Sequence, residues 1–224
     1  MFSLAIETSS SQGSVALGRG DELLAVADVP QHRRHNLDLM PTIAGLCVEH
    51  GATPADLGEV YVSLGPGSFT GLRIGIATAK MLALARGVRL VGVPTLDVLV
   101  QNAPHESSPV AVGLNLKHQT IWSALYTWRS DSWRCTAEPA LRHADDLRAL
   151  GPGAVLGDPL PPLDGMHLLP PELAVPRAEA LWRLGHAAAR AGRFTDALQL
   201  TPLYVREPEA VALWDKRHGP ARPA

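Results

Sequence analysis

A glycine-rich turn is the part of this sequence with the clearest capacity for chemistry. The run GPGSFTG places Gly65, Gly67 and Gly71 between a predicted strand and a predicted helix. Glycine adopts backbone shapes that other residues avoid, and the N–H groups at a helix N-terminus attract anions. The turn could therefore hold a phosphate, although no Lys-Ser/Thr pair follows it at the spacing of a Walker A loop. The alternative is a tight turn whose only task is to let the helix pack closely.

Side chains that could bind a metal or a nucleotide are sparse. Glu7, in ETSSSQGS, ends the first predicted strand, where its carboxylate could contact a nucleotide or bond to nearby backbone. His32 and His35, in QHRRHN, are three residues apart, and two histidines without further protein ligands make a poor zinc site. A solvated basic loop is therefore the favoured interpretation of QHRRHN, and the sequence predicts no metal site and no cofactor.

The elements that position these residues follow a regular order in the first half of the chain. Short apolar runs bounded by turn residues predict strands, and apolar residues at helical spacing predict helices. Three strands in a meander are followed by alternating helices and strands, which predicts a mixed sheet with helices on both faces. The strands are expected at residues 2–8, 14–17, 22–29, 59–64 and 89–93, and the helices at 36–50, 70–86 and 95–102, the last one capped by Thr95.

A shorter copy of this pattern fills the second half. The stretch 103–109 contains two prolines and two serines and is the expected boundary, so the predicted domains are residues 1–104 and 105–224. The second lobe is expected to be a reduced version of the first. Its strands are predicted at 110–116, 120–128, 132–137 and 154–157, its helices at 144–150 and 177–191, and a proline-rich loop at 158–176.

The helix predicted at 70–86 is apolar on nearly every side. Only Arg73, Lys80 and Arg86 are charged, whereas a helix with one face on a sheet should have a polar back. Since a helix that is apolar all round is normally buried on two sides, we expect another chain to cover it. One surface also carries only small residues, which would let another helix come close: Gly71, Gly75, Ala79 and Ala83.

Composition and charge limit the function classes. Hydrophobic residues make up 46% of the 224 residues and charged residues 19%, as in ordinary soluble proteins. The formal net charge of -2 argues against a protein that binds nucleic acid by itself, because phosphate contacts need a basic face. Cys47 and Cys135 form neither a metal-ligand spacing nor a disulfide framework. The sequence shows no signal peptide and no apolar run long enough to cross a bilayer, so we expect no membrane contact and a cytoplasmic location.

Four segments together resemble one known family. LAIETSSSQGSVAL, LGPGSFTGLRIGIATAKMLA, VGVPTLDVL and TPLYVRE are similar to the TsaB (YeaZ-like) proteins, most densely over residues 3–100. The resemblance implies an α/β protein with two βββαβα-type lobes of the actin-like ATPase (ribonuclease-H-like) fold, the second one reduced. It also implies a non-catalytic dimerisation subunit of the complex that adds threonylcarbamoyl to the tRNA adenosine beside the anticodon.

The partners of the chain are implied by the same resemblance. A TsaB-like subunit binds and orders a TsaD-like catalytic paralogue, which carries the metal-binding histidines, and a TsaE-like ATPase joins the pair. Such subunits form a homodimer when the partner is absent. They act on tRNA only indirectly, through the complex.

By position, the resemblance assigns the helices at 36–50 and 70–86 to a helix-on-helix contact with the partner. Ile76→Glu, or a bulky residue at Gly75, is then expected to abolish pairing while leaving the lobe folded. The candidate nucleotide contacts are Glu7, Thr8 and Lys117. The implied interface residues are Met40, Ile43, Cys47, Gly67, Ser68, Phe69, Thr70, Gly71, Leu72, Arg73, Gly75, Ile76, Ala79, Lys80 and Ala83.

An active small-molecule kinase or ATPase of the same fold is the first alternative. Enzymes of that kind hold Mg²⁺ with an aspartate on the first strand and another on the matching strand of the second lobe. Here Glu7 and Asn115 occupy these positions, and a neutral amide cannot offset the charge of the metal as a carboxylate does. A metallopeptidase-like enzyme, suggested only by His32 and His35, is the second alternative.

Overall fold

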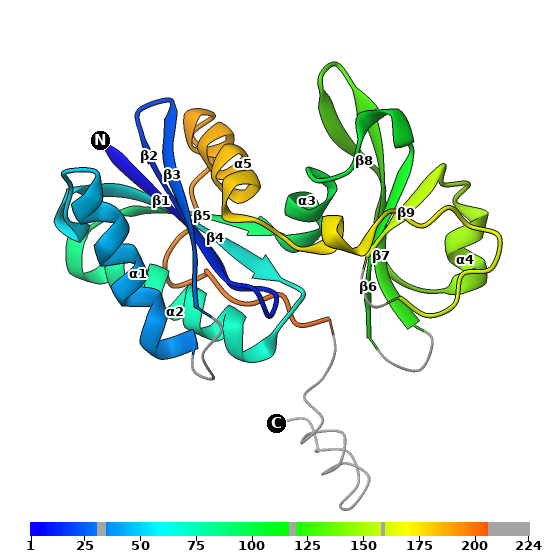
Figure 1. The fold of residues 1–224 in the computed structure, drawn as a ribbon, viewed down its shortest axis with the longest axis horizontal. Helices are drawn as coiled ribbons and strands as arrows, with labels where there is room; N and C mark the ends of the chain where they lie inside the picture. Colours follow the sequence, from blue (N-terminus) through cyan, green and yellow to red (C-terminus); the bar gives the residue numbers. More distant parts are fainter. Residues whose placement is uncertain (31–34, 117–119, 158–159, 206–224) are drawn as a thin grey trace, which may run out of the picture.

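The first of two lobes is built on a five-stranded sheet in the computed structural model, which describes residues 1–30, 35–116, 120–157 and 160–205 (Figure 1). The β1–β2 and β2–β3 pairs are antiparallel, and the β1–β4 and β4–β5 pairs are parallel. This order and these directions are those of an actin-like ATPase lobe, which confirms the predicted fold class. In sheet order β3-β2-β1-β4-β5, the strands are β3 (Glu22–Asp28), β2 (Ser14–Arg19), β1 (Phe2–Glu7), β4 (Leu57–Gly65) and β5 (Arg89–Pro94).

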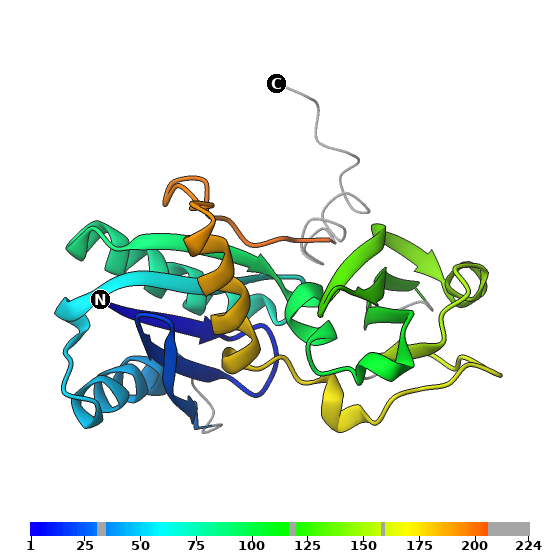
Figure 2. The ribbon, with the colours of Figure 1, turned by 90° about the horizontal axis from the view of Figure 1, so that it is seen from above.

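Helices cover both faces of this sheet (Figures 1 and 2). Because alternate residues of a strand point to opposite faces, each strand contributes to two cores. Leu4 and Ile6 of β1 pack with the two helices of one face, whereas Ala5 between them packs with the helix of the other. The helices are α1 (His35–Glu49) and α2 (Phe69–Arg86) on the first face and α5 (Ala178–Arg190) on the second.

Helix α5 lies on the first lobe, although the sequence pattern places it in the second. Trp182 of α5 is buried against Gly18 of β2, where a Cβ atom would overlap the indole ring, and the indole N–H donates to Ser3 Oγ at 2.9 Å. The Ala178 N–H, at the start of α5, donates to Ser14 Oγ at 3.0 Å. The division into residues 1–104 and 105–224 stays a prediction, and the structure adds that the chain returns to the first lobe after the second sheet.

The second lobe contains a four-stranded sheet with β6 and β9 parallel and the other pairs antiparallel. Strand β8 extends beyond the predicted 132–137, and the proline-rich stretch contains a short 3-10 helix in its described part. In sheet order the strands are β8 (Ser132–His143), β7 (Thr120–Arg129), β6 (Val110–Asn115) and β9 (Ala154–Leu156). The short helices are α3 (Thr95–Val100) and α4 (Ala144–Ala149), with the 3-10 helices η1 (Pro54–Asp56), η2 (His105–Ser107) and η3 (Pro171–Ala174).

Helix α3 joins the two lobes. Val98 packs with the core between the first sheet and α5, whereas Leu96 and Leu99 pack with apolar residues of the second sheet. The prediction that Thr95 caps this helix is wrong, because Pro94 occupies the cap position and Thr95 is the first helical residue. The Thr95 side chain is buried, and its hydroxyl has no hydrogen-bond partner.

After α5 the chain runs back along the first sheet. Thr195 forms a bridge to Leu90 of β5, and the Leu203 N–H donates to the Leu64 carbonyl oxygen at 2.7 Å. The Tyr204 ring then packs on Phe69, the first residue of α2, with ring centroids 5.2 Å apart. These contacts hold the return segment, residues 193–205, on the lobe where the chain begins.

Candidate functional site

The glycine-rich turn packs against the loop between β1 and β2. The Ser68 N–H donates to the Ser9 carbonyl oxygen at 2.6 Å, and Ser68 Oγ accepts from the Gly71 N–H at 3.2 Å, which caps α2. A Cβ atom on Gly67 or Gly71 would overlap the backbone of Ser9 or Thr8. These contacts support the tight-turn interpretation, because protein atoms already accept from two of the N–H groups that a bound phosphate would use.

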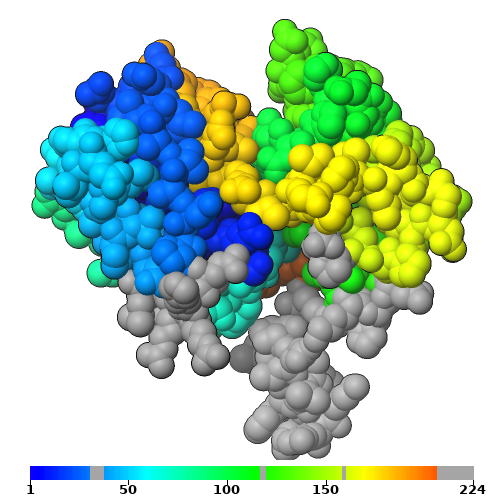
Figure 3. All heavy atoms as spheres, in the orientation of Figure 1, coloured from blue at the N-terminus to red at the C-terminus, as the bar shows by residue number. Residues whose placement is uncertain are grey.

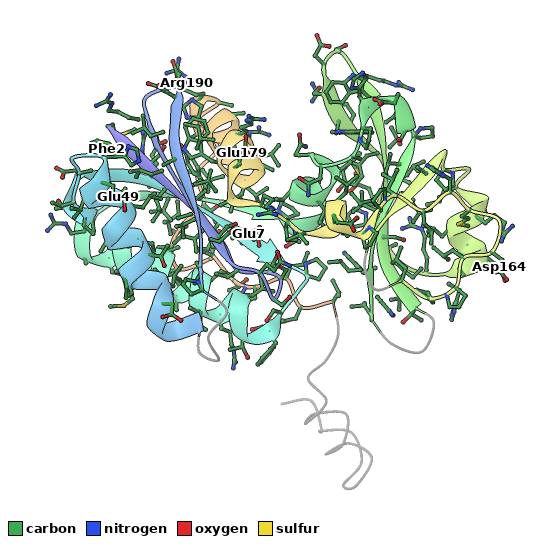
Figure 4. The ribbon with its side chains drawn as sticks, in the orientation of Figure 1. Phe2, Glu7, Glu49, Asp164, Glu179 and Arg190 are labelled. Atoms are coloured by element: carbon green, nitrogen blue, oxygen red, sulfur yellow. The ribbon has the colours of Figure 1, made fainter. Side chains whose placement is uncertain are left out.

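Glu7 is fully buried next to this turn, near the centre of the molecule in Figure 4. Its Oε1 accepts from the Ser9 N–H at 2.7 Å and from the Ser9 hydroxyl at 2.5 Å, and its Oε2 accepts from the Ser63 hydroxyl. Burial raises the pKa of the Glu7 carboxyl, because desolvation outweighs the hydrogen bonds from Ser63 and Ser9 that lower it. Both carboxylate oxygens are therefore engaged by the chain itself.

Thr8 and Lys117 are the other candidate nucleotide contacts. Thr8 is buried too, and its hydroxyl, which has no hydrogen-bond partner, lies where a Cβ atom on Gly75 would be. Lys117 lies outside the described residues. Glu7 and Thr8 therefore present no exposed polar side-chain atom to a nucleotide.

Replacing Glu7 by glutamine should change how stability depends on pH. A carboxyl whose pKa is raised by folding stabilises the protein fully below its unfolded pKa, and this contribution is lost as pH rises through the folded pKa. The Glu7→Gln variant has no ionisable group at this position, so its stability does not fall with rising pH for this reason. Its free energy of unfolding, relative to that of the unchanged protein, should therefore increase as pH rises above 4.5, the ordinary value.

Urea unfolding of both proteins between about pH 4 and about pH 8 measures this difference. Glu49 of α1, an exposed glutamate, provides the matched Glu49→Gln substitution (Figure 4). Equal pH trends in the two variants would contradict the role given to the burial of Glu7.

Many of the interface residues expected on α1 and α2 face the interior of the chain. Gly71 and Gly75 let α2 approach the end of β1 instead of another helix, since a Cβ atom on either would overlap an atom of Thr8. This packing contradicts the expectation that Ile76→Glu or a bulky residue at Gly75 leaves the lobe folded. The buried members are Ile43, Cys47, Gly71, Leu72, Gly75, Ile76 and Ala79.

The remaining members of the expected interface lie at or near the surface. The Arg73 guanidinium lies over the Phe69 ring, 4.2 Å from its centroid, and Phe69 also packs on Tyr204 of the return segment. The start of α2 is thus held to the C-terminal part of the described chain. The exposed members are Met40, Gly67, Phe69, Thr70 and Arg73, and the half-buried ones are Ser68, Lys80 and Ala83.

A set of exposed apolar residues on the same two helices was not among the expected interface residues. Val48 of α1 is 70% exposed, and Met81 and Leu84 of α2 are 65% and 74% exposed. Ala77 is also exposed, four residues before Met81, so that α2 presents several apolar side chains on one side, with the half-buried Lys80 beside them. We call Met40, Val48, Ala77, Met81 and Leu84 the α1–α2 apolar surface. Figure 3 shows the outer side of α1 uncovered by other described parts of the chain.

The sequence contained a signal for this surface, but not the side on which it lies. Helix α2 is apolar all round, and periodicity alone does not say which apolar face meets the sheet. Its inner face packs on the first sheet through Ile76, Ala79 and Leu82. Met81 and Leu84 are then left on the outer face, where no described residue covers them.

Among the described residues, no group of three or more histidines, cysteines, aspartates and glutamates is arranged to hold a metal ion. The predicted loop with His32 and His35 falls outside the side chains that the structure describes. No helix within the described ranges is both long and apolar enough to cross a bilayer.

Comparisons with known proteins point to one group. A family model described as "TsaD: tRNA N6-adenosine threonylcarbamoyltransferase" matches residues 29–158. The "tRNA threonylcarbamoyladenosine biosynthesis protein TsaB" of Bacillus subtilis is 30% identical over 130 residues, which is 58% of this chain and 57% of that protein. The Escherichia coli protein of the same name is 28% identical over 148 residues, or 62% of this chain and 64% of that protein. The alignments thus span less than two thirds of either relative.

A solved structure extends the similarity to nearly the whole chain. It is described as an uncharacterised protein from Pseudomonas aeruginosa with similarity to peptidase YEAZ. It superposes with a TM-score of 0.77 and 25% sequence identity, covering 92% of this chain and 99% of that one. The similarity therefore includes the second lobe and the return of α5 to the first.

Proposed function

Since the chain belongs to the TsaB/YeaZ family, we propose that it is a non-catalytic subunit of the machinery that makes threonylcarbamoyladenosine in tRNA. In this proposal it binds a TsaD-like catalytic paralogue and holds it in the form that modifies the adenosine next to the anticodon. The names of the similar proteins support the reaction, and the α1–α2 apolar surface is the observation that supports the binding role.

The α1–α2 apolar surface is unusual for a surface that faces only water. Large apolar side chains at single exposed positions are common, but Met81 and Leu84 adjoin Ala77 on one side of α2, and α1 adds the exposed Val48. An amphipathic helix docks through residues spaced three, four and seven apart, which is the spacing of these three α2 residues. A helix of a partner could therefore pack along α2 and bury them.

The surroundings of Glu7 support a subunit without its own phosphate chemistry. A carboxylate that holds Mg²⁺ must direct an oxygen toward the metal. Here the oxygens of Glu7 accept hydrogen bonds from Ser9 and Ser63, and Asn115 at the matching position of the second lobe is a neutral amide. These residues give no support to the alternative of an active kinase or ATPase.

Further partners belong to the same proposal. A TsaE-like ATPase would join the pair, and the chain would reach tRNA only through the complex. A homodimer in the absence of the TsaD-like paralogue would use the same α1–α2 apolar surface, since two copies can bury one patch symmetrically. The cytoplasmic location expected from the sequence remains part of this proposal.

The proposal predicts one result in cells and one with purified proteins. Depletion of the chain should lower the threonylcarbamoyladenosine content of total tRNA, measured by mass spectrometry of nucleosides, and re-expression should restore it. The tagged chain should co-purify with the TsaD-like paralogue from the native lysate. By itself it should neither modify tRNA nor turn over ATP.

Two outcomes would contradict the proposal. One is an unchanged content of the modified nucleoside after depletion. The other is Mg²⁺-dependent ATP turnover by the purified chain that disappears in a Glu7→Gln variant, because such a result would assign catalysis to this subunit.

A further inference from the structure

A groove lies between the two lobes, on the side of helix α5. Its cavity has a volume of about 480 Å³, which is in the range of small-molecule sites in proteins. Its walls come from four places: the end of β5, helix α3, the hairpin of β7 and β8, and the C-terminal half of α5 with the residues after it. Figure 3 shows the surface hollowed between α5 and that hairpin. Nothing in the proposed function uses this groove.

Asp97 of α3 provides the negative charge of the groove. The Tyr126 hydroxyl donates to Asp97 Oδ1 at 2.6 Å, and in the part of the chain that the structure describes no cation pairs with this carboxylate. Burial raises the pKa of the Asp97 carboxyl, the hydrogen bond from Tyr126 lowers it, and the charge of Glu138 raises it again. The inner end of the groove thus holds a half-buried carboxylate with another acid nearby and no counter-ion among the described residues.

Aromatic rings and arginines complete the lining. Tyr126, Trp133 and Phe194 line the groove, and aromatic faces attract ammonium groups. The Arg89 guanidinium already lies over the Phe194 ring, 4.3 Å from its centroid, so Tyr126 and Trp133 are the rings that can receive a ligand cation. Arg134 and Arg193 also line it and are exposed, and within the described ranges neither forms an ion pair. Neither arginine forms an ion pair with Asp97 in the described part of the chain, so the groove holds one unpaired acid and two unpaired cations.

We propose that this groove binds a small aliphatic molecule with an ammonium group at one end and a carboxylate at the other. The ammonium group pairs with Asp97 at the inner end, between Tyr126 and Trp133. The carboxylate lies at the mouth, where Arg134 and Arg193 provide cationic donors. The aliphatic chain between them packs on the apolar wall formed by Val93 and Leu184. A ligand with one charge satisfies only one end, and a diamine places its second cation beside the arginines.

Titration of the isotope-labelled full chain with 5-aminopentanoate tests this arrangement. The backbone amide signals of groove residues such as Gln101, Cys135 and Thr195 should shift in a saturable manner. Pentylammonium, which has only the cation, should bind more weakly, and pentanoate, which has only the anion, more weakly still. An Asp97→Asn variant should bind 5-aminopentanoate at least about tenfold more weakly than the unchanged chain. The variant loses a charge-assisted contact with the ligand but keeps an oxygen that accepts from Tyr126.

Two further variants keep the result decisive. Asp145→Asn, at an exposed carboxylate of α4 outside the groove, should bind like the unchanged protein. Arg193→Gln should weaken the binding of 5-aminopentanoate and leave that of pentylammonium unchanged. The proposal is overturned if no saturable shift occurs, if Asp97→Asn binds as tightly as the unchanged chain, or if pentylammonium and 5-aminopentanoate bind equally well.

Discussion

Replacing Ile76 by glutamate should unfold the first lobe instead of detaching a partner from a folded one. Ile76 is 4% exposed and belongs to the core that α1 and α2 form with the sheet. A carboxylate there has no cationic partner in that apolar core, and an unpaired buried charge costs several kcal/mol. Since whole domains are stable by about 5–15 kcal/mol, one such change takes away a large share of the total.

Thermal and urea unfolding followed by circular dichroism measure this effect. Ala77→Glu is the matched control, because Ala77 is the next residue of α2 and is exposed. The control should unfold within about 0.5 kcal/mol of the unchanged protein, as surface substitutions usually do. If Ile76→Glu were equally stable and lost only its partner, the inner face of α2 would be an interface after all.

A double substitution on the outer face, Met81→Glu with Leu84→Glu, should have the opposite result. Both side chains are mostly exposed, so the fold should retain its stability within about 1 kcal/mol, the sum of two surface changes. Pairing with the TsaD-like paralogue should weaken by about 100-fold or more, because removing an apolar anchor from the centre of an interface costs about 2 kcal/mol or more. Two introduced carboxylates would also have to lose water in the complex.

Binding titration with the purified paralogue measures the loss of pairing, and circular dichroism checks the fold. Leu141→Glu is the matched control, since Leu141 is an exposed apolar residue on β8 of the second lobe. It should leave pairing unchanged. Retention of pairing by the double variant, with loss in the Leu141→Glu control, would move the proposed interface to the second lobe.

Much of the fold was predictable because local signals agreed with one another. The glycines at 87 and 192 follow the ends of α2 and α5 with positive φ, as expected from their places after apolar helical runs. The strands of both sheets were recognisable as short apolar runs between turn residues. Strand β8 was predicted too short, because its outer half alternates less clearly and carries Pro139.

The sequence did not reveal which face of α2 packs on the sheet, or which lobe α5 packs against. An all-round apolar helix such as α2 gives no preferred face, so residues 76 and 81 could not be told apart by periodicity. Contacts with Thr8 determine which face of α2 packs on the sheet, because the backbone and side chain of Thr8 leave no room for a Cβ atom at positions 71 and 75. The position of α5 is likewise decided by a distant contact, that of Trp182 with Gly18, which no local pattern reveals.

The groove beside Asp97 could not have been predicted, because its lining residues come from segments between residues 91 and 195. Asp97 is a single acid on a short helix in the sequence. Only the folded chain brings Asp97 to Tyr126 and Trp133. In the described part of the fold, no cationic side chain forms an ion pair with Asp97.

The return of α5 to the first lobe has a consequence for synthesis on the ribosome. The first five strands emerge early, but the helix that covers Ala5, Tyr61 and Val91 follows only after the whole second sheet has been made. Until then one side of the nascent sheet exposes apolar side chains to solvent, where a chaperone or another nascent chain can bind it. The chain must therefore complete its second lobe before its first lobe is protected.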